Sequence, residues 1–289
     1  MQNRRDLSRR EFLCGTAGLG VAAFATGCAS SWFVSDGPAY AAQLYSIHKI
    51  FWQKPEWCLA GLKAGGFAGV EFAGYADHTA KEIAKLLADA GLRGMGTHVN
   101  GNVDLVGDGL KRTLDFCAAA GIESVTTPHA KKDSADEYRR FGHDMGLAAE
   151  AAAAYGIKVG IHTTYHHFTT KYDGVTAWDL MFSDASPLLQ QQIDTSNTFH
   201  TGTDVVALLR KYRGRHHSVH LKENTPSKTA TIGEPPTDGG PLVPWDDVLG
   251  YLATEKVAWY VIEAEKIPDS LSPLIDSLRF VDARRAAIA

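Results

Sequence analysis

Four side chains with metal-binding chemistry follow four successive apolar runs in the second half of the sequence. His167 comes shortly after I-K-V-G-I-H, and Asp194 directly after L-L-Q-Q-Q-I. His220 follows H-H-S-V, and Glu263 follows W-Y-V-I. Nitrogen and oxygen ligands carried by consecutive parallel strands can converge on one divalent cation at the mouth of a barrel. The spacing therefore predicts one bound metal ion, and the mixed donors favour Mn, Co, Ni, Fe or Zn over Ca.

Lys222 lies two residues after His220, close to the predicted metal site. A strand points alternate side chains to one face, so the Lys222 ammonium is expected beside the ion, where it could polarise a carbonyl or stabilise an enolate. The alternative is an ordinary solvated loop lysine. We predict Glu263 as the proton-abstracting group, with Lys222 and His98 as further catalytic residues.

Other polar and aromatic side chains follow the remaining apolar runs. His129 and His162 each could be an ordinary hydrogen-bonded histidine, but several histidines gathered at one rim favour a functional site. Trp52 follows the first run, and an aromatic face can stack on the C–H surface of a sugar ring. The predicted substrate-binding residues are therefore His129, His162 and Trp52.

A repeating unit of strand and helix must position these groups. The segment from Thr79 to Ala90 has a capping sequence, one apolar face and a stop at Gly91, and similar helical patterns occupy residues 110–119, 135–155, 204–212, 246–254 and 271–287. Eight β-rich runs alternate with such segments, which predicts an α/β fold, a (β/α)8 TIM barrel formed as a single domain by residues 39–289. These runs are centred near Gln43, Glu71, Thr97, Thr126, Ile161, Ile193, Val219 and Ile262.

The first 28 residues are expected to be an export signal rather than part of the barrel. Arginine pairs at positions 4–5 and 9–10 precede an apolar stretch, and S-R-R-E-F-L is similar to a twin-arginine motif. Cys28 ends A-T-G-C, which resembles a lipobox, so a lipidated Cys28 could tether the protein to a membrane. The alternative is a plain cleaved signal. Residues 29–38 are predicted to be a short linker, and the mature protein to be periplasmic or a membrane-anchored lipoprotein.

Composition narrows the class of partner. The 289 residues are 45% hydrophobic with a formal net charge of −4. That length is ample for one core, and so small a charge creates no field to attract nucleic acid or anionic lipid. A small-molecule substrate and no nucleic acid are therefore expected, while the oligomeric state stays open. Cys58 and Cys117, the cysteines beyond the predicted signal, are expected to be buried thiols in helices.

Four segments of the predicted barrel carry a family resemblance. They read A-Q-L-Y-S from Ala42, G-G-F-A-G-V-E-F-A-G-Y from Gly65, G-I-K-V-G-I-H from Gly156 and V-H-L-K-E from Val219. Their order and spacing resemble the xylose isomerase-like barrels of the sugar phosphate isomerase/epimerase family. The resemblance implies a divalent metal held by a carboxylate after strand five, an Asp after strand six, a His on strand seven and a Glu on strand eight. Asp194, His220 and Glu263 match the last three.

The fifth-strand segment departs from the family pattern. Where such proteins often read His-Asn-His-x-x-Glu-Phe, this chain reads H-T-T-Y-H-H-F from His162, which places His167 at the Glu position. In the family's epimerases the two metal-bound Glu residues take and return a proton on opposite faces of the substrate. A metal-bound imidazole has no free lone pair to serve as that base, so the change argues against a simple two-carboxylate epimerisation.

The resulting prediction is a metal-dependent carbohydrate enzyme that abstracts a proton next to a carbonyl of a sugar or keto-sugar. The overall reaction would be an isomerisation, an epimerisation or an elimination. Expected export favours free or oxidised sugars over phosphorylated ones, with a 3-keto-glycoside lyase or hydratase as the more specific hypothesis. One alternative is an endonuclease IV-like DNA-repair enzyme of the same superfamily, against which the charge and the export signal count. Another is a non-catalytic sugar-binding lipoprotein, which would not require convergent metal ligands.

Overall fold

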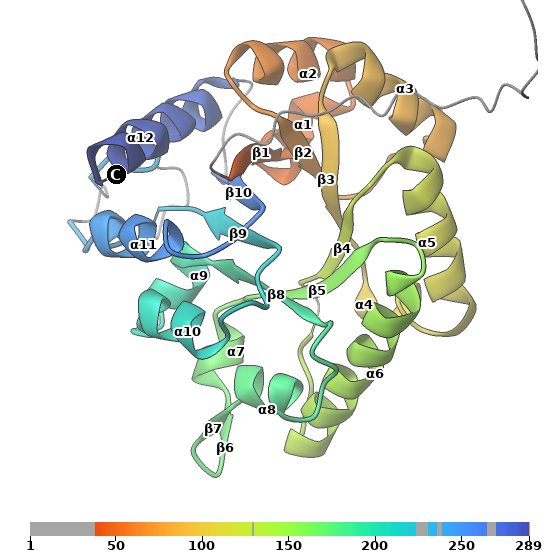
Figure 1. Cartoon of the computed structure of the whole chain (residues 1–289), viewed down its shortest axis with the longest axis vertical. Coiled ribbons are helices and arrows are strands. Elements are labelled where there is room, and N and C mark those ends of the chain that lie inside the picture. Colours follow the sequence, from red (N-terminus) through yellow and green to blue (C-terminus); the bar gives the residue numbers. More distant parts are fainter. Residues whose placement is uncertain (1–37, 129, 224–230, 236–238, 265–269, 289) are drawn as a thin grey trace, which may run out of the picture. The chain divides into compact units, whose positions relative to one another are not determined.

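The computed structural model describes residues 38–128, 130–223, 231–235, 239–264 and 270–288. Eight of its strands close into a barrel whose neighbours all run parallel (Figure 1). This confirms the predicted (β/α)8 TIM barrel. In order around the ring, the strands are β1 (Ala39–Gln43), β10 (Trp259–Ile262), β9 (Ser218–Leu221), β8 (Gln190–Asp194), β5 (Lys158–His162), β4 (Ser124–Thr127), β3 (Arg93–His98) and β2 (Gly69–Phe72).

Helices surround the ring of strands (Figure 1). No helix in the described ranges is both long and apolar enough to span a bilayer. A short antiparallel hairpin, β6 (Lys171–Tyr172) and β7 (Val175–Thr176), precedes α8. The helices are η1 (Leu44–Ile47), α1 (His48–Phe51), α2 (Pro55–Ala64), α3 (Ala80–Ala90), α4 (Gly101–Asp104), α5 (Gly107–Ala120), α6 (Ala135–Ala153), α7 (His166–Thr169), α8 (Ala177–Ser183), α9 (Thr195–Phe199), α10 (Val205–Lys211), α11 (Trp245–Leu252) and α12 (Ser272–Ile288).

Local signals explain where the longer helices begin and end. The Thr79 hydroxyl accepts the backbone N–H of Glu82, and the Glu82 carboxylate accepts the backbone N–H of Thr79, which together form a capping box at the start of α3. The helix ends at Gly91, whose φ of 62° is a left-handed conformation that favours glycine. Gly121 and Gly156 also take positive φ between a helix and the following strand.

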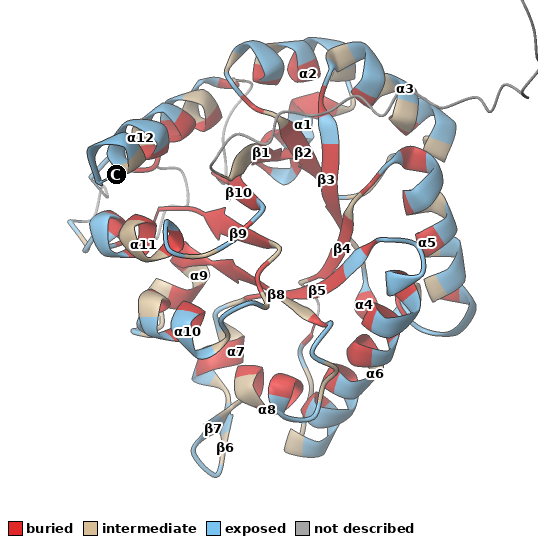
Figure 2. Ribbon diagram, in the orientation of Figure 1, coloured by how far each residue is buried: buried red, intermediate tan, exposed pale blue. Residues whose placement is uncertain are grey.

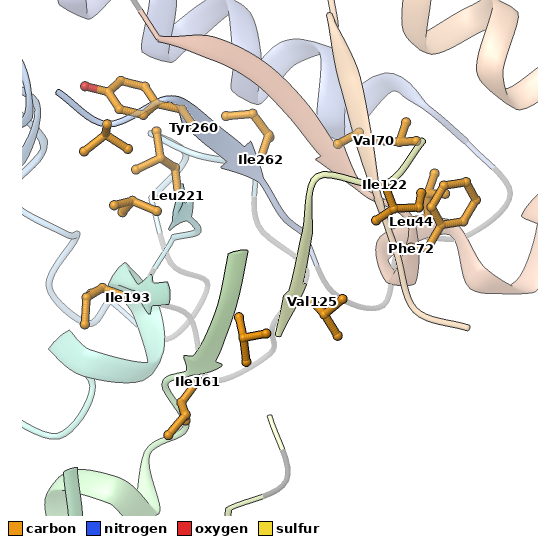
Figure 3. Close-up of a cluster of buried hydrophobic side chains, with 14 of the residues drawn as sticks. Leu44, Val70, Phe72, Ile122, Val125, Ile161, Ile193, Leu221, Tyr260 and Ile262 are labelled. Carbon is orange, nitrogen blue, oxygen red and sulfur yellow. The ribbon is translucent and has the colours of Figure 1, made fainter. Parts of the chain in front are cut away.

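Alternation along the strands separates the barrel interior from the layer beneath the helices. Ile193, Leu221 and Ile262 belong to the main hydrophobic core and point away from their strands (Figure 3). Their neighbours Gln192 and His220 have the opposite parity and make contacts inside the barrel. Figure 2 shows the strands buried over most of their length. One-residue alternation thus decides which side chains can enter the interior.

The interior itself is divided into an apolar and a polar layer. Ala41, Met95, Trp259 and Val261 form a separate apolar cluster toward the amino ends of the strands. Polar side chains fill the next layer toward the carboxyl ends, and each of them is at most 2% exposed: Gln43, Glu71, Gln192, Asp194 and His220. The largest buried polar side chains of the interior therefore lie toward the carboxyl ends of the strands.

Short elements after the strand ends were not indicated by the sequence. The helices η1, α1, α4, α7, α8 and α9 span four to seven residues each, which is too short for a helical period to be recognised. Cys58 and Cys117 are free and buried, as predicted. The predicted signal and all of the predicted linker except Pro38 lie outside the described residues.

Candidate metal centre and pocket

Asp194, His220 and Glu263 lie together inside the barrel, and His162 completes the group. His162 and Asp194 end β5 and β8, His220 lies in β9, and Glu263 directly follows β10. One ligand atom from each residue lies within 4.8 Å of the others, and all four side chains are buried. Two imidazoles and two carboxylates at this spacing are a donor set that could hold one divalent cation. We call these four residues the metal-site group.

Lys222 contacts this group on the face that its spacing from His220 predicts. Its ammonium lies 3.1 Å from Oε1 of Glu263 and 3.6 Å from Oδ2 of Asp194. The side chain is only 5% exposed, so Lys222 is a buried cation rather than a solvated loop lysine. A desolvated ammonium beside two carboxylates can act on a substrate oxygen with little screening from water.

Glu71, which we did not predict as a site residue, lies directly behind the metal-site group. One of its oxygens, Oε2, accepts hydrogen bonds from Gln43 Nε2 at 2.6 Å and from His220 Nε2 at 2.6 Å. The other oxygen accepts from Gln192 Nε2 at 2.7 Å. Glu71 is fully buried and links three strands to the β9 histidine.

The close packing of Glu71 depends on a small neighbour in β3. A Cβ added at Gly96 would lie 3.1 Å from Oε1 of Glu71 and 2.5 Å from Oγ of Ser124. A larger residue at Gly96 would therefore displace the carboxylate. The signal in the sequence was a charged residue at an inward position of the otherwise apolar run G-V-E-F.

The hydrogen bonds of Gln192 set the orientation of two histidines. Its amide nitrogen donates to Glu71 and to Ser218, so its Oε1 is the acceptor for His98 Nε2 at 2.8 Å and His162 Nδ1 at 2.9 Å. With Nδ1 of His162 donating, its Nε2 carries the lone pair and faces Asp194 Oδ2 at 3.8 Å. His162 is thereby prepared to act as a metal ligand.

Charge compensation in the site centres on His220. Burial lowers the pKa of His220, but Glu71 and Glu263 outweigh it and raise the value to about 10. Burial acts to raise the pKa of Glu263, yet Lys222 and His220 hold it well below its usual value. For Asp194 burial dominates and raises the pKa, with Lys222 acting in the opposite direction. Lys222 and His220 thus keep Glu263 ionised, whereas burial disfavours the charged form of Asp194 unless a further cation lies beside it.

Asp194 provides a test of whether a cation fits this group. Its Oδ1 accepts the backbone N–H of Asn197 at 2.8 Å, whereas Oδ2 is buried without a hydrogen-bond partner. The Lys222 ammonium lies 3.6 Å from Oδ2, beyond hydrogen-bond distance, so the contact between Oδ2 and the lone pair of His162 Nε2 stays unfavourable unless a cation lies between those two atoms. The residues present therefore fit a divalent cation.

The structure corrects the predicted ligand from the fifth strand, because it brings His162 rather than His167 to the group. His167 lies in α7, fully buried, with its ring 5.5 Å from that of Trp178. Its Nδ1 accepts the backbone N–H of Thr164 at 3.1 Å. The chain turns after β5, so a residue five positions beyond the strand packs against α8 instead of the barrel interior. His162, predicted as a substrate-binding residue, lies instead where it could serve as a ligand.

The metal-site group opens into a pocket of about 920 Å³. Lys222, Glu263, His98 and His162 line its base, whereas Trp52 is not among its described lining residues. Trp52 stacks on His78 with ring centroids 4.7 Å apart, so its predicted role in substrate binding is not supported by its position. The chain turns through η1 immediately after β1, which brings Tyr45 to the rim instead (Tyr45 is 51% exposed). His129 lies outside the described residues.

This chain matches a family model over most of its length and one relative over about half of it. A family model described as "Xylose isomerase-like TIM barrel" matches residues 59–284. Inosose dehydratase 1 of Bacillus cereus is 29% identical over 153 residues. That match covers 47% of this chain and 49% of the relative, so the similarity spans about half of the relative's length.

Two solved structures illustrate the fold similarity. A sugar phosphate isomerase/epimerase from Parabacteroides distasonis superimposes with a TM-score of 0.72 at 16% identity, covering 86% of this chain and 97% of that one. A 3-keto-D-glucoside 4-epimerase from E. coli gives a TM-score of 0.62 at 15% identity, covering 86% and 100%. At such identities the likeness is one of fold.

Proposed function

The chain belongs to the xylose isomerase-like TIM barrel family, and from its site we propose a divalent-metal-dependent carbohydrate enzyme that abstracts a proton next to a carbonyl of a sugar or keto-sugar. The observation that carries this proposal is the buried metal-site group of His162, Asp194, His220 and Glu263 beneath an open pocket. A binding protein without catalysis would have no need of convergent metal ligands beside a buried lysine.

Glu263 is the proposed proton acceptor. Its low pKa means that the carboxylate is ionised at neutral pH, and it lines the pocket where a substrate carbon can approach. Lys222, 3.1 Å from Glu263, is positioned to donate a hydrogen bond to the substrate oxygen as negative charge develops. A divalent cation in the metal-site group would supply Lewis-acid polarisation of the substrate carbonyl.

The segment at the fifth strand favours a reaction in which a single base removes the proton from one face of the substrate. Because this chain has His167 where the family pattern has Glu, and the β5 residue in the metal-site group is His162, the group has no second carboxylate from this segment to return a proton from the opposite face, as a two-carboxylate epimerase would need. Elimination needs only one base: the electron pair of the broken C–H bond forms a double bond, and the neighbouring C–O bond breaks with its electrons on oxygen. The partial relative named inosose dehydratase supports this interpretation, because its name describes removal of water. A 3-keto-glycoside lyase or hydratase is our favoured specialisation.

The experiment combines metal analysis with solvent exchange. The protein, purified with its natural metal, should contain about one ion of Mn, Co, Ni, Fe or Zn per chain. In deuterium oxide, it should exchange the hydrogen next to the carbonyl in one member of a panel of ketoses, aldoses and 3-keto-glycosides, and chelation should stop this exchange. Full exchange and turnover after complete metal removal would contradict the proposal.

Export is a separate proposal, supported by the first 28 residues alone. We expect the native chain to be secreted through the twin-arginine pathway and lipidated at Cys28. Cell fractionation and mass spectrometry of the mature N-terminus test this, with Cys28→Ser expected to release the protein from the membrane fraction. Replacement of Arg9 and Arg10 by Lys should retain it in the cytoplasm, and normal export of that variant would count against a twin-arginine signal.

A further inference from the structure

The pocket extends well beyond the residues that could act on a reacting carbon. Its volume of about 920 Å³ lies at the upper end of the roughly 300–1,000 Å³ typical of small-molecule sites. Lys222 and Glu263 follow β9 and β10, whereas another part of the lining comes from α5, which connects β3 to β4. These strands lie on different sides of the barrel ring (Figure 1). A single sugar ring held at Glu263 would leave the α5 side uncontacted.

Helix α5 presents a stripe of three side chains, Arg112, Thr113 and Phe116, to the outer region of the pocket, which is the part away from Lys222 and Glu263. Arg112, Thr113 and Phe116 line the pocket, and their spacing along the helix places them on one face. The Phe116 ring lies 4.4 Å from that of Tyr75, which forms the adjoining wall. Among the described residues, neither the Arg112 guanidinium nor the Thr113 hydroxyl has a protein hydrogen bond or ion pair. A cation, a hydroxyl and paired aromatic rings are thus available to a ligand.

The backbone that carries this stripe is closely packed. A Cβ added at Gly109 would lie 1.9 Å from the carbonyl oxygen of Val103, and one at Gly101 would lie 2.9 Å from the side chain of Thr127. Asn100 caps α4 by accepting the backbone N–H of Asn102, and its own N–H is accepted by Asp104 at 2.9 Å. The Gly101 contact, together with the hydrogen bond from Gly101 N–H to Thr127 Oγ1, holds the start of α4 against β4, and the others pack α5 closely on α4. The backbone that carries the stripe is therefore fixed in place before a ligand binds.

We propose that the α5 stripe is a second sugar subsite, which binds the ring or substituent attached to the reacting sugar, so that the substrates are glycosides rather than free monosaccharides. The proposal rests on the proposed function for the placement of the reacting ring. Phe116 and Tyr75 offer apolar faces to the C–H surface of a second ring, and Arg112 and Thr113 offer hydrogen bonds to its hydroxyls. The inner and outer regions belong to one pocket, so a two-ring molecule can contact both.

Binding and turnover are measured separately in the test. Calorimetry on the full chain compares glucose and galactose with cellobiose, maltose and lactose as unreactive probes. At least one disaccharide should bind about tenfold tighter than its monosaccharide, and Arg112→Met and Phe116→Ala should each remove most of that advantage. Lys111→Met, on the same helix but outside the pocket lining, is the matched control and should retain it. Equal affinity for all disaccharides and monosaccharides overturns the subsite.

Turnover distinguishes the subsite from the chemistry. With the 3-keto forms of glucose and of these disaccharides, Arg112→Met should lower kcat/KM for the glycosides about tenfold and leave the value for 3-keto-glucose unchanged. Disaccharide selectivity without any solvent exchange or turnover would keep the subsite and reject the proposed reaction. Turnover that is equally fast for 3-keto-glucose and its glycosides, and insensitive to Arg112→Met, would keep the reaction and reject the subsite.

Discussion

Oε2 of Glu71 lies 2.6 Å from Nε2 of His220, although 149 residues separate the two in the chain. The other ring nitrogen, Nδ1 of His220, lies 2.7 Å from Oε2 of Glu263. Because Glu71 engages Nε2, it directs Nδ1 toward Glu263 and the centre of the metal-site group. A carboxylate behind a ligating histidine sets its tautomer and increases its basicity. Glu71 thus acts on the site through His220 as a positioning residue.

Glu71→Gln should weaken metal binding by about 10- to 100-fold, because the amide no longer provides a charged acceptor for Nε2 of His220. Competition with a chromophoric chelator measures the metal dissociation constant. Glu123→Gln is a matched control, since Glu123 bonds Arg93 and Trp259 at the opposite end of the barrel and should leave the constant unchanged. Unaltered affinity in Glu71→Gln would show that Glu71 does not support the ligand.

His162→Ala and His167→Ala should change different properties: the first should lower the metal content, and the second should lower the stability of the fold. Loss of His162 removes one ligand of the metal-site group, so the purified variant should contain little metal while remaining folded. Loss of His167 leaves a void against Trp178 and should destabilise the protein by about 2 kcal/mol, with metal content retained. Elemental analysis and denaturant unfolding measure the two quantities. Metal loss in His167→Ala with full retention in His162→Ala would restore His167 as the ligand.

Lys222→Met should preserve metal binding and reduce turnover by about 10²-fold or more, the usual effect of removing one preorganised donor at a developing oxyanion. Exchange of the substrate α-hydrogen with solvent deuterium should fall in parallel, because the affected barrier is enolisation itself. Lys211→Met removes a lysine that pairs with Asp179 on the surface and serves as control. If Lys222→Met exchanges and turns over normally, the electrophilic role passes to His98.

His217 should make the folded protein less stable in mild acid. Burial, then Lys158 and Arg93, lower the pKa of His217 to about 4, with Glu71 acting weakly in the opposite direction. Between pH 6.5 and 4 the unfolded chain therefore binds a proton that the folded chain does not, so the free energy of unfolding decreases as the pH falls through this window.

Urea unfolding at pH 7 and pH 5 tests this contribution. His217→Asn should reduce the pH-dependent loss of unfolding free energy by about 1–2 kcal/mol relative to the parent protein, since one pKa unit corresponds to about 1.4 kcal/mol. The other buried histidines account for the pH dependence of the unfolding free energy that remains in this variant. His143→Asn changes an exposed histidine and should leave the loss as it was. An identical pH dependence in His217→Asn and the parent would exclude His217 as a source of acid sensitivity.

Much of the architecture was readable from the sequence because its causes are local. The alternating strand runs, the capping box at Thr79 and the glycine stops such as Gly91 depend on neighbouring residues only, and they predicted the eight barrel strands and the longer helices correctly. Parity explains why Lys222 was correctly placed on the face of His220. The convergence of Asp194, His220 and Glu263 follows from strand ends that share one rim.

The rest of the site depended on contacts between distant segments. Glu71 reaches His220 across the barrel interior, and the space it occupies exists because β3 has Gly96 at that point. The sequence pattern assigned His167 to the metal and His162 to the substrate, and only the turn of the chain after β5 brings His162 rather than His167 into the metal-site group. Likewise, the α5 wall joins the pocket through packing of α4 against α5 rather than through a motif. Local periodicity determines which way a side chain points along a strand; the direction of the chain beyond the strand end, and hence the shape of the pocket, is set by tertiary packing.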